Sequence, residues 1–241
     1  MSASVEEIKA RKKFSSDGRY LRFPGLTVVC DMQDSEAGEL GQLPKVLHAQ
    51  PCLGRMMSPL PPESYHVTLL DICCQYKLGM DDDAWSAKLQ DPCWAALAKE
   101  VEEADFRPTL RVQKVTMWSG GIGVVMESAE ESTAEHPGSV PLGKRMASFL
   151  GIGSDQKHPW HFTLAYCPQP GAFDSCDPNI LEAERQAVEV AVKAALPDAV
   201  TLAPARLCRF ESMEAFVPWD GLLSIVGKDV GSAENDEDSA K

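Results

Sequence analysis

The pattern that most constrains this chain is a strand-like run in which histidine and threonine alternate with apolar residues. The run WHFTLAY at residues 160–166 is rich in aromatic, β-branched and aliphatic side chains, and Pro159 and Pro168 bracket it. Alternate side chains of a strand face opposite ways, so His161 and Thr163 share one face. The apolar residues share the other face, which is expected to be buried.

A second copy of the pattern lies upstream, as YHVTLL at residues 65–70. Here His66 and Thr68 project together on the polar face. The apolar face of this strand is expected to contain Tyr65, Val67 and Leu69. Either copy alone is also what an ordinary strand with a surface histidine looks like. Two copies with the same alternation indicate one site with two imidazoles and two hydroxyls.

The composition indicates a globular chain with an acidic surface. It has 241 residues, 44% of them hydrophobic and 24% charged, and 36 acidic against 23 basic residues give a net charge of −13. Proteins that hold long nucleic acid by its phosphates rely on clustered Lys and Arg, so we expect no long nucleic-acid partner. A small nucleotide or a short RNA end remains compatible, because a local pocket can differ in sign from the whole surface.

No pattern in the sequence indicates a metal ion, a cofactor or a membrane. The eight cysteines include no Cys-x-x-Cys spacing, which argues against a zinc ribbon. The run Asp81–Asp83 is interpreted as a solvated helix start, because nothing else points to converging carboxylates. The charged N-terminus resembles no signal peptide, and no stretch of about 20 apolar residues occurs. A cytoplasmic protein with reduced thiols is the simplest expectation.

The order of the expected elements alternates strands and helices. They are a strand at 26–32, a helix from about 39 that ends at Pro51, a strand at 64–72, one or two helices up to about 104, a hairpin at 109–127, a helix face at 142–150, the His161 strand, a helix at 178–196 and a final β segment at 200–219. The cluster Gly120–Gly123 is interpreted as the hairpin turn. It lacks the Lys-Ser/Thr ending of a phosphate-binding P-loop.

The expected fold class is α+β, with two similar β-α-β lobes whose antiparallel sheets face a central cleft. Each His-apolar-Thr strand falls in a different half of the chain, so each lobe would contribute one. The expected organisation is an N-terminal arm at 1–13, one bilobal domain at 14–227 and an acidic disordered tail at 228–241. We expect a monomer.

These motifs resemble the 2H phosphoesterase superfamily, in which two His-x-Thr strands form one site. The two histidines are 95 positions apart, and the resemblance covers roughly residues 14–220. Phe14, Asp17-Gly18, FPGLTV at 23–28 and YHVT at 65–68 look closest to a poorly characterised subgroup. The superfamily includes RNA 2′,3′-cyclic phosphodiesterases, 2′-5′ RNA ligase-like proteins and related exonucleases. The resemblance implies a metal-independent phosphodiesterase in which His161 activates water and His66 protonates the leaving sugar oxygen.

The residue types support the same chemistry independently of the resemblance. Cleavage of a phosphodiester needs a base for the attacking oxygen and an acid for the leaving oxygen, and two histidines titrating near neutrality can supply both. Thr68 and Thr163 can donate hydrogen bonds to the non-bridging phosphate oxygens. The sequence does not decide which histidine is the acid.

Substrate contacts are less constrained than the catalytic residues. Trp118 and Tyr20 are candidates to stack on a base, together with Phe23 and the segment 216–219, although aromatic side chains more often belong to the core. Three alternatives to hydrolysis stay open. They are an RNA ligase-type activity, a catalytically silent nucleotide-binding module and a scaffold in which the four His and Thr residues lie far apart.

Overall fold

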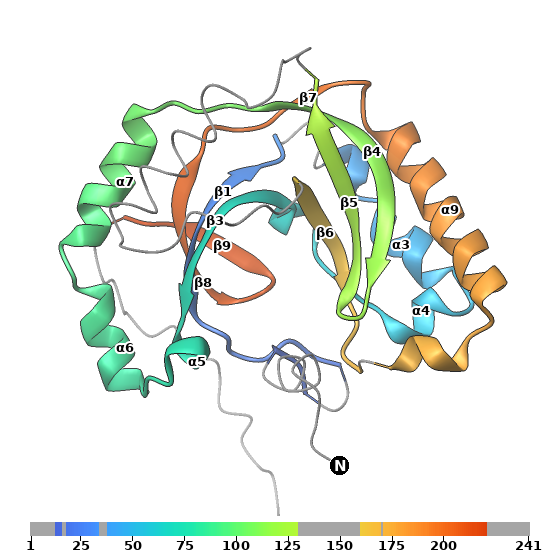
Figure 1. Ribbon diagram of the computed structural model, residues 1–241, viewed down its shortest axis with the longest axis horizontal. Coiled ribbons are helices and arrows are strands. Elements are labelled where there is room, and N and C mark those ends of the chain that lie inside the picture. Colours follow the sequence, from blue (N-terminus) through green and yellow to red (C-terminus); the bar gives the residue numbers. More distant parts are fainter. Residues whose placement is uncertain (1–12, 16–17, 34–37, 130–159, 170, 221–241) are drawn as a thin grey trace, which may run out of the picture.

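Two antiparallel sheets lie side by side in the computed structural model, with helices on their outer sides (Figure 1). The structure describes residues 13–15, 18–33, 38–129, 160–169 and 171–220. The first sheet has the order β3-β1-β8-β9, and the second has the order β2-β6-β5-β4-β7. The expected α+β class with paired sheets is therefore confirmed.

The strands follow the expected segments closely. The first sheet contains β1 (Gly25–Asp31), β3 (His66–Cys74), β8 (Arg206–Ser212) and β9 (Ala215–Pro218). The second contains β2 (Ser58–Pro59), β4 (Thr109–Trp118), β5 (Gly121–Ser128), β6 (His161–Tyr166) and β7 (Val200–Thr201). The hairpin expected at 109–127 is formed by β4 and β5, which pair in antiparallel register.

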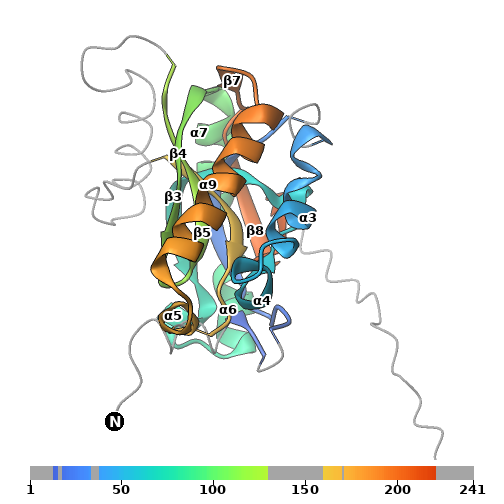
Figure 2. The ribbon, with the colours of Figure 1, turned by 90° about the vertical axis from the view of Figure 1, so that its right-hand side faces the viewer.

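The helices cover the outer sides of the two sheets (Figures 1 and 2). Beside the first sheet lie α6 (Asp82–Leu89) and α7 (Cys93–Glu103), and beside the second lie α3 (Leu43–His48), α4 (Leu53–Met56) and α9 (Pro178–Ala195). Short turns at α5 (Gln75–Leu78), η1 (Pro62–Ser64) and η2 (Ala172–Ser175) complete the described elements. The Asp81 carboxylate caps the Ala84 amide at the start of α6, so the interpretation of the Asp run as a helix start is confirmed.

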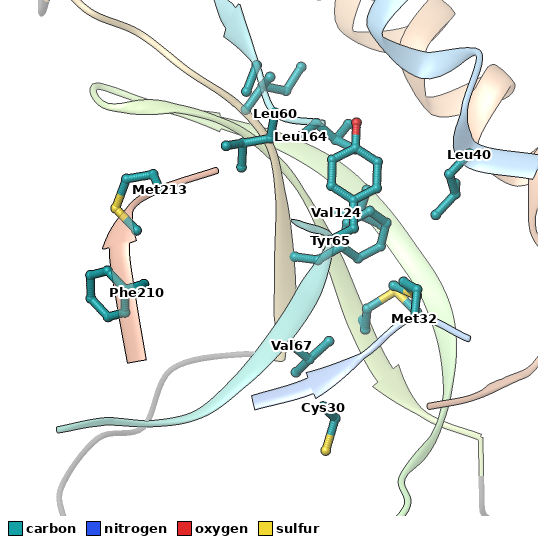
Figure 3. Close-up of a cluster of buried hydrophobic side chains, with 14 of the residues drawn as sticks. Cys30, Met32, Leu40, Leu60, Tyr65, Val67, Val124, Leu164, Phe210 and Met213 are labelled. Carbon is teal, nitrogen blue, oxygen red and sulfur yellow. The ribbon is translucent and has the colours of Figure 1, made fainter. Parts of the chain in front are cut away.

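One buried cluster connects the two sheets and fixes β3 against β6 (Figure 3). Tyr65 is 1% exposed, and its ring centroid lies 5.7 Å from that of the fully buried Phe162. Figure 3 shows Tyr65 among Leu60, Val124 and Leu164. These apolar neighbours of the two histidines face away from the His-Thr faces, as the strand alternation predicts.

The expected burial of Leu69 is wrong, and Leu70 takes its place. Leu70 is 4% exposed, whereas Leu69 is only half-buried. The pairing with β1 shows the reason: Val28 is opposite Leu70 and Val29 is opposite Thr68, so Leu69 is skipped. A β-bulge of this kind inserts one residue and shifts the alternation beyond it. The shift comes after Thr68, so the His66–Thr68 pair keeps its common face.

Several expected segments lie outside the described residues. These are residues 1–12 of the N-terminal arm, the helix face at 142–150, and residues from 221 onward, which include the tail. The domain limits of 14 and 227 therefore stay a prediction. Among the described helices, none is both long and apolar enough to cross a membrane.

Candidate functional site

The two His-Thr strands meet where the two sheets adjoin. In the first sheet β3 is the edge strand, and in the second β6 is separated from the edge only by the two-residue β2. Thr68 is exposed, and His66, His161 and Thr163 are half-buried, so solvent reaches all four side chains. Tyr65 precedes His66 and Phe162 follows His161, and their ring centroids are 5.7 Å apart, so the two motifs lie close together. The scaffold alternative, in which the two motifs lie far apart, is thereby excluded.

The surroundings of His66 define its reactive atom. Its Nδ1 lies 2.7 Å from the carbonyl oxygen of Ser64. Because a carbonyl can only accept a hydrogen bond, Nδ1 carries a hydrogen and Nε2 is the nitrogen left for chemistry. The Phe216 ring packs 4.0 Å from the imidazole, centroid to centroid. Burial lowers the pKa of His66 below its ordinary value, so the free protein favours the neutral ring.

Trp118 lies on the face of the second sheet that carries His161 and Thr163. Its ring centroid is 6.2 Å from that of His161, in an edge-to-face arrangement. On the neighbouring strand, Gly123 pairs directly with Thr163. A Cβ placed on Gly123 would lie 2.9 Å from the Trp118 ring, and one on Gly121 would lie 3.3 Å from it. The same Cβ atoms would lie even closer to backbone carbonyl oxygens of β6, at 2.6 Å from Phe162 and 2.4 Å from Ala165. Glycine at these two positions therefore allows both the close approach of β6 and the position of the indole.

Tyr20, the other candidate for stacking on a base, lies in a different setting. Its hydroxyl donates to the Ser58 carbonyl oxygen at 2.8 Å, and its ring packs on Phe14 at 5.0 Å. Burial raises the pKa of Tyr20 far above its ordinary value. These contacts hold the N-terminal segment against β2. A contact between Tyr20 and a substrate stays a prediction.

Two charged residues beside His66 were not singled out from the sequence. Asp31 is the cross-strand partner of His66 on β1, and the Arg206 guanidinium on β8 donates to the Asp31 carboxylate. Burial is the largest single influence and acts to lower the pKa of Arg206, but the hydrogen bond to Asp31 and the nearby negative charges together outweigh it, so the pKa is raised. Little in the sequence pointed to these two residues, because Asp31 is a single charge at the end of an apolar strand and Arg206 is a single charge at the start of another.

The described residues contain no cluster of three or more His, Cys, Asp or Glu side chains that could hold a metal ion. The eight cysteines form no disulfide. The polar groups that the described strands bring together are therefore the imidazoles, hydroxyls and the Asp31–Arg206 pair. This set can exchange protons and donate hydrogen bonds to an anion.

The sequence of residues 13–119 matches the 2H-phosphodiest family, which is characterised as a domain of unknown function (DUF1868). The matched region covers a little under half of the chain. This region includes the His66 strand and Trp118, whereas the His161 strand lies beyond it. No curated protein matches the sequence.

One solved structure shares the fold of this chain, and two others are similar to it with lower scores. A conserved protein of unknown function, ATU0111 from Agrobacterium tumefaciens, superposes with a TM-score of 0.66 at 18% identity, over 86% of this chain and 89% of that one. LigT from Escherichia coli gives a TM-score of 0.46 at 12% identity, over 82% and 95% of the two chains. Usb1 from Kluyveromyces marxianus, solved with uridine monophosphate, gives 0.39 at 10% identity, over 82% and 98%. The first of these establishes that the two-sheet fold is shared.

Proposed function

We propose that this protein is a phosphodiesterase that uses His66 and His161 as acid and base without a metal ion. Its substrate would be a cyclic nucleotide phosphate or the end of a short oligonucleotide. The observation that carries the proposal is the meeting of the two His-Thr strands at the junction of the sheets. The phosphoesterase superfamily supports the reaction class.

In the proposed reaction, one imidazole removes a proton from the attacking water as its oxygen forms a bond to phosphorus. The bond from phosphorus to the leaving sugar oxygen breaks, and the other imidazole delivers a proton to that oxygen. For a cyclic phosphate the product is an open phosphomonoester with a free hydroxyl. Thr68 and Thr163 would donate hydrogen bonds to the non-bridging oxygens as their charge is redistributed.

We assign the leaving-group proton to Nε2 of His66 and the activation of water to His161. The hydrogen bond from Nδ1 to Ser64 orients His66 with Nε2 toward the reacting groups. In the free protein burial favours neutral His66, but a bound phosphate adds a negative charge that favours the imidazolium. Substrate binding would therefore supply the electrostatic condition for proton delivery.

The direct test is turnover of a substrate panel in the presence of EDTA. The panel contains nucleoside 2′,3′-cyclic phosphates, 2′-5′ and 3′-5′ oligoadenylates, and short RNAs with a cyclic phosphate end. Hydrolysis that survives the chelator and requires His66 and His161 would support the proposal. Activity that returned only with an added divalent ion would contradict it. Ligation of RNA ends, or tight nucleotide binding without turnover, would instead favour the ligase-type or silent alternative.

The pH dependence of kcat/KM is expected to be bell-shaped, with its acid limb below about pH 6.5, the ordinary histidine pKa. The mechanism needs one neutral and one protonated imidazole, so activity is lost when both are protonated. The lower of the two pKa values sets that limb, and the pKa of His66 already lies below the ordinary value because of burial. Initial rates from pH 4.5 to 9 measure the limb. An acid limb above pH 7 would contradict this description of His66.

Trp118 is proposed to stack on the substrate base next to His161. Replacing Trp118 with alanine is expected to raise KM for a nucleotide substrate roughly 5- to 100-fold, since stacking of a base on an aromatic ring is worth about 1–3 kcal/mol. Trp118→Phe should retain most of the affinity. A cyclic phosphate without a base, such as glycerol cyclic phosphate, provides the control. An equal loss with that substrate would show that Trp118 supports the fold rather than the base.

A further inference from the structure

The residues around His66 include an ion pair that the proposed proton transfer does not use. Asp31 on β1 lies directly across from His66 on β3 in the antiparallel pairing. The Nε of Arg206 on β8 donates to Oδ2 of Asp31, and both side chains are largely buried, at 30% and 20% exposure. A buried pair of this kind is screened little by salt, so its charges act on nearby groups more strongly than a surface pair would.

Arg206 also connects to the ring that packs on His66. Its Nη2 donates to the carbonyl oxygen of Phe216 at 3.3 Å. The remaining nitrogen, Nη1, is buried and has no hydrogen-bond partner among the described residues. The guanidinium thus makes its polar contacts through Asp31 and Phe216. In one direction it holds the carboxylate, and in the other it holds the backbone that places the Phe216 ring 4.0 Å from the imidazole.

The Phe216 ring is supported from its other side as well. It packs on Phe210 at 5.2 Å, and Phe210 stacks on Phe23 at 6.5 Å. A Cβ on Gly25 would lie 2.2 Å from the Phe210 ring, so the row of rings depends on the absence of a side chain at that position. The β8–β9 hairpin therefore reaches His66 as a packed unit, and Arg206 is its polar connection to β1.

The charged groups that act on His66 come from three strands. Asp31 from β1 favours the imidazolium, whereas Arg206 from β8 and His161 from β6 oppose it. The other two neighbours are uncharged: η1 provides the Ser64 carbonyl and β9 the Phe216 ring. Without Arg206, the negative charge of Asp31 would stabilise the imidazolium and keep His66 protonated. Such a histidine could donate a proton but could not readily be regenerated by a second proton transfer at neutral pH.

We propose that Arg206 and Asp31 are positioning residues that keep His66 able to exchange its proton. Arg206 holds the carboxylate away from the imidazole, balances its charge and fixes the Phe216 ring against His66. This inference rests on the proposed function for its catalytic meaning. The geometry of the ion pair and of the ring stands without that function.

NMR titration of the His66 imidazole in the substrate-free protein tests the proposal, with the resonance assigned by its loss in His66→Ala. Arg206→Met is expected to raise the pKa of His66, because Asp31 loses its partner. Asp31→Asn is expected to lower the pKa, because the charge of Arg206 is left uncompensated. In the double variant, the pKa of His66 should lie between the values of the two single variants. Arg107→Met breaks the exposed Arg107–Asp105 pair and should leave the titration unchanged.

A second readout reports the position of the ring. The His66 ring protons should show an upfield shift caused by the Phe216 ring, and Phe216→Leu should abolish it. Arg206→Lys keeps the charge but loses the forked contact, so it should weaken this shift while leaving the pKa near that of the wild type. Shifts of the pKa in the same direction for Arg206→Met and Asp31→Asn, or no shift in either, would overturn the proposal.

The catalytic arm of the test is separate from the titration. In a protein that hydrolyses the panel, the acid limb of kcat/KM should move upward in Arg206→Met and downward in Asp31→Asn, in step with the NMR values. If the panel is not hydrolysed, the proposed function fails. The opposite pKa shifts would still be observed if the inference about Asp31 and Arg206 is right.

Discussion

Replacing His161 with alanine is expected to lower kcat/KM by a factor of about 10² to 10⁴, and His66→Ala should have an effect of similar size. In the proposed reaction each imidazole transfers a proton in the transition state, and each lies two residues before a Thr on its strand. Because the two groups act in one step, the double variant should be only slightly worse than either single variant. Steady-state turnover of the best panel substrate measures these losses.

A histidine outside the site provides the matched control. His48 lies exposed on α3, where its Nδ1 contacts the Pro44 carbonyl at 3.0 Å. His48→Ala should therefore retain full turnover. A loss of less than about tenfold in His161→Ala, with the fold intact, would contradict the proposed role of that residue.

The same variants can separate the acid from the base when the leaving group is changed. A nitrophenolate ion departs without being protonated, so a nitrophenyl phosphodiester of a nucleoside needs the base but not the acid. His66→Ala should then recover much of its activity on this substrate, whereas His161→Ala should not. Recovery in His161→Ala instead would reverse the two roles.

The second large effect concerns the stability of the fold. Glu184 on α9 is 5% exposed, and its carboxylate accepts backbone hydrogen bonds from Cys52 at 2.9 Å and Leu53 at 2.8 Å. These amides begin α4, where no side chain of that helix caps them. Glu184→Gln turns one acceptor oxygen into a donor that faces N–H groups. The free energy of unfolding should therefore fall by about 2–4 kcal/mol.

Thermal or urea unfolding followed by circular dichroism measures this change, and a fall in Tm of roughly 5–15 °C is expected for a chain of this size. Glu182→Gln on the same helix is the control. Glu182 is about half-exposed and pairs with Arg185, so Glu182→Gln should lower the Tm much less than Glu184→Gln does. Equal effects of the two substitutions would show that burial of Glu184 contributes no special stability.

Local patterns were enough to predict most elements, including the two strands that carry the His-Thr motifs, whereas the roles of the four His and Thr residues stay a prediction. The alternation in residues 160–166 and 65–70 depends only on neighbours in sequence, as does the apolar stripe of α9. The burial of Leu70 in place of Leu69 could not be predicted this way. It arises from the register between β3 and β1, which are far apart in the chain.

The side chains that surround the two His-Thr strands were harder to predict for the same reason. Phe216 was one of several aromatic candidates, and nothing local indicates that β9, at the far edge of the first sheet, brings its ring to His66 on β3. Asp31 and Arg206 are 175 positions apart, so no spacing rule connects them. Glycines 121 and 123 could be explained as turn residues, whereas in the structure a Cβ at either position would meet the β6 backbone and the indole of Trp118.

The strand order of the first sheet has a consequence for synthesis on the ribosome. β1 lies in the interior of that sheet, with β3 on one side and β8, from the last part of the described chain, on the other. Until β8 has been made, a nascent chain carries the apolar segment Leu26–Cys30 with one open edge, which other chains can pair with. With the order β3-β1-β8-β9, the surroundings of His66 are completed only late in synthesis. Before that point the open edge of β1 is the segment that a ribosome-bound chaperone would need to protect.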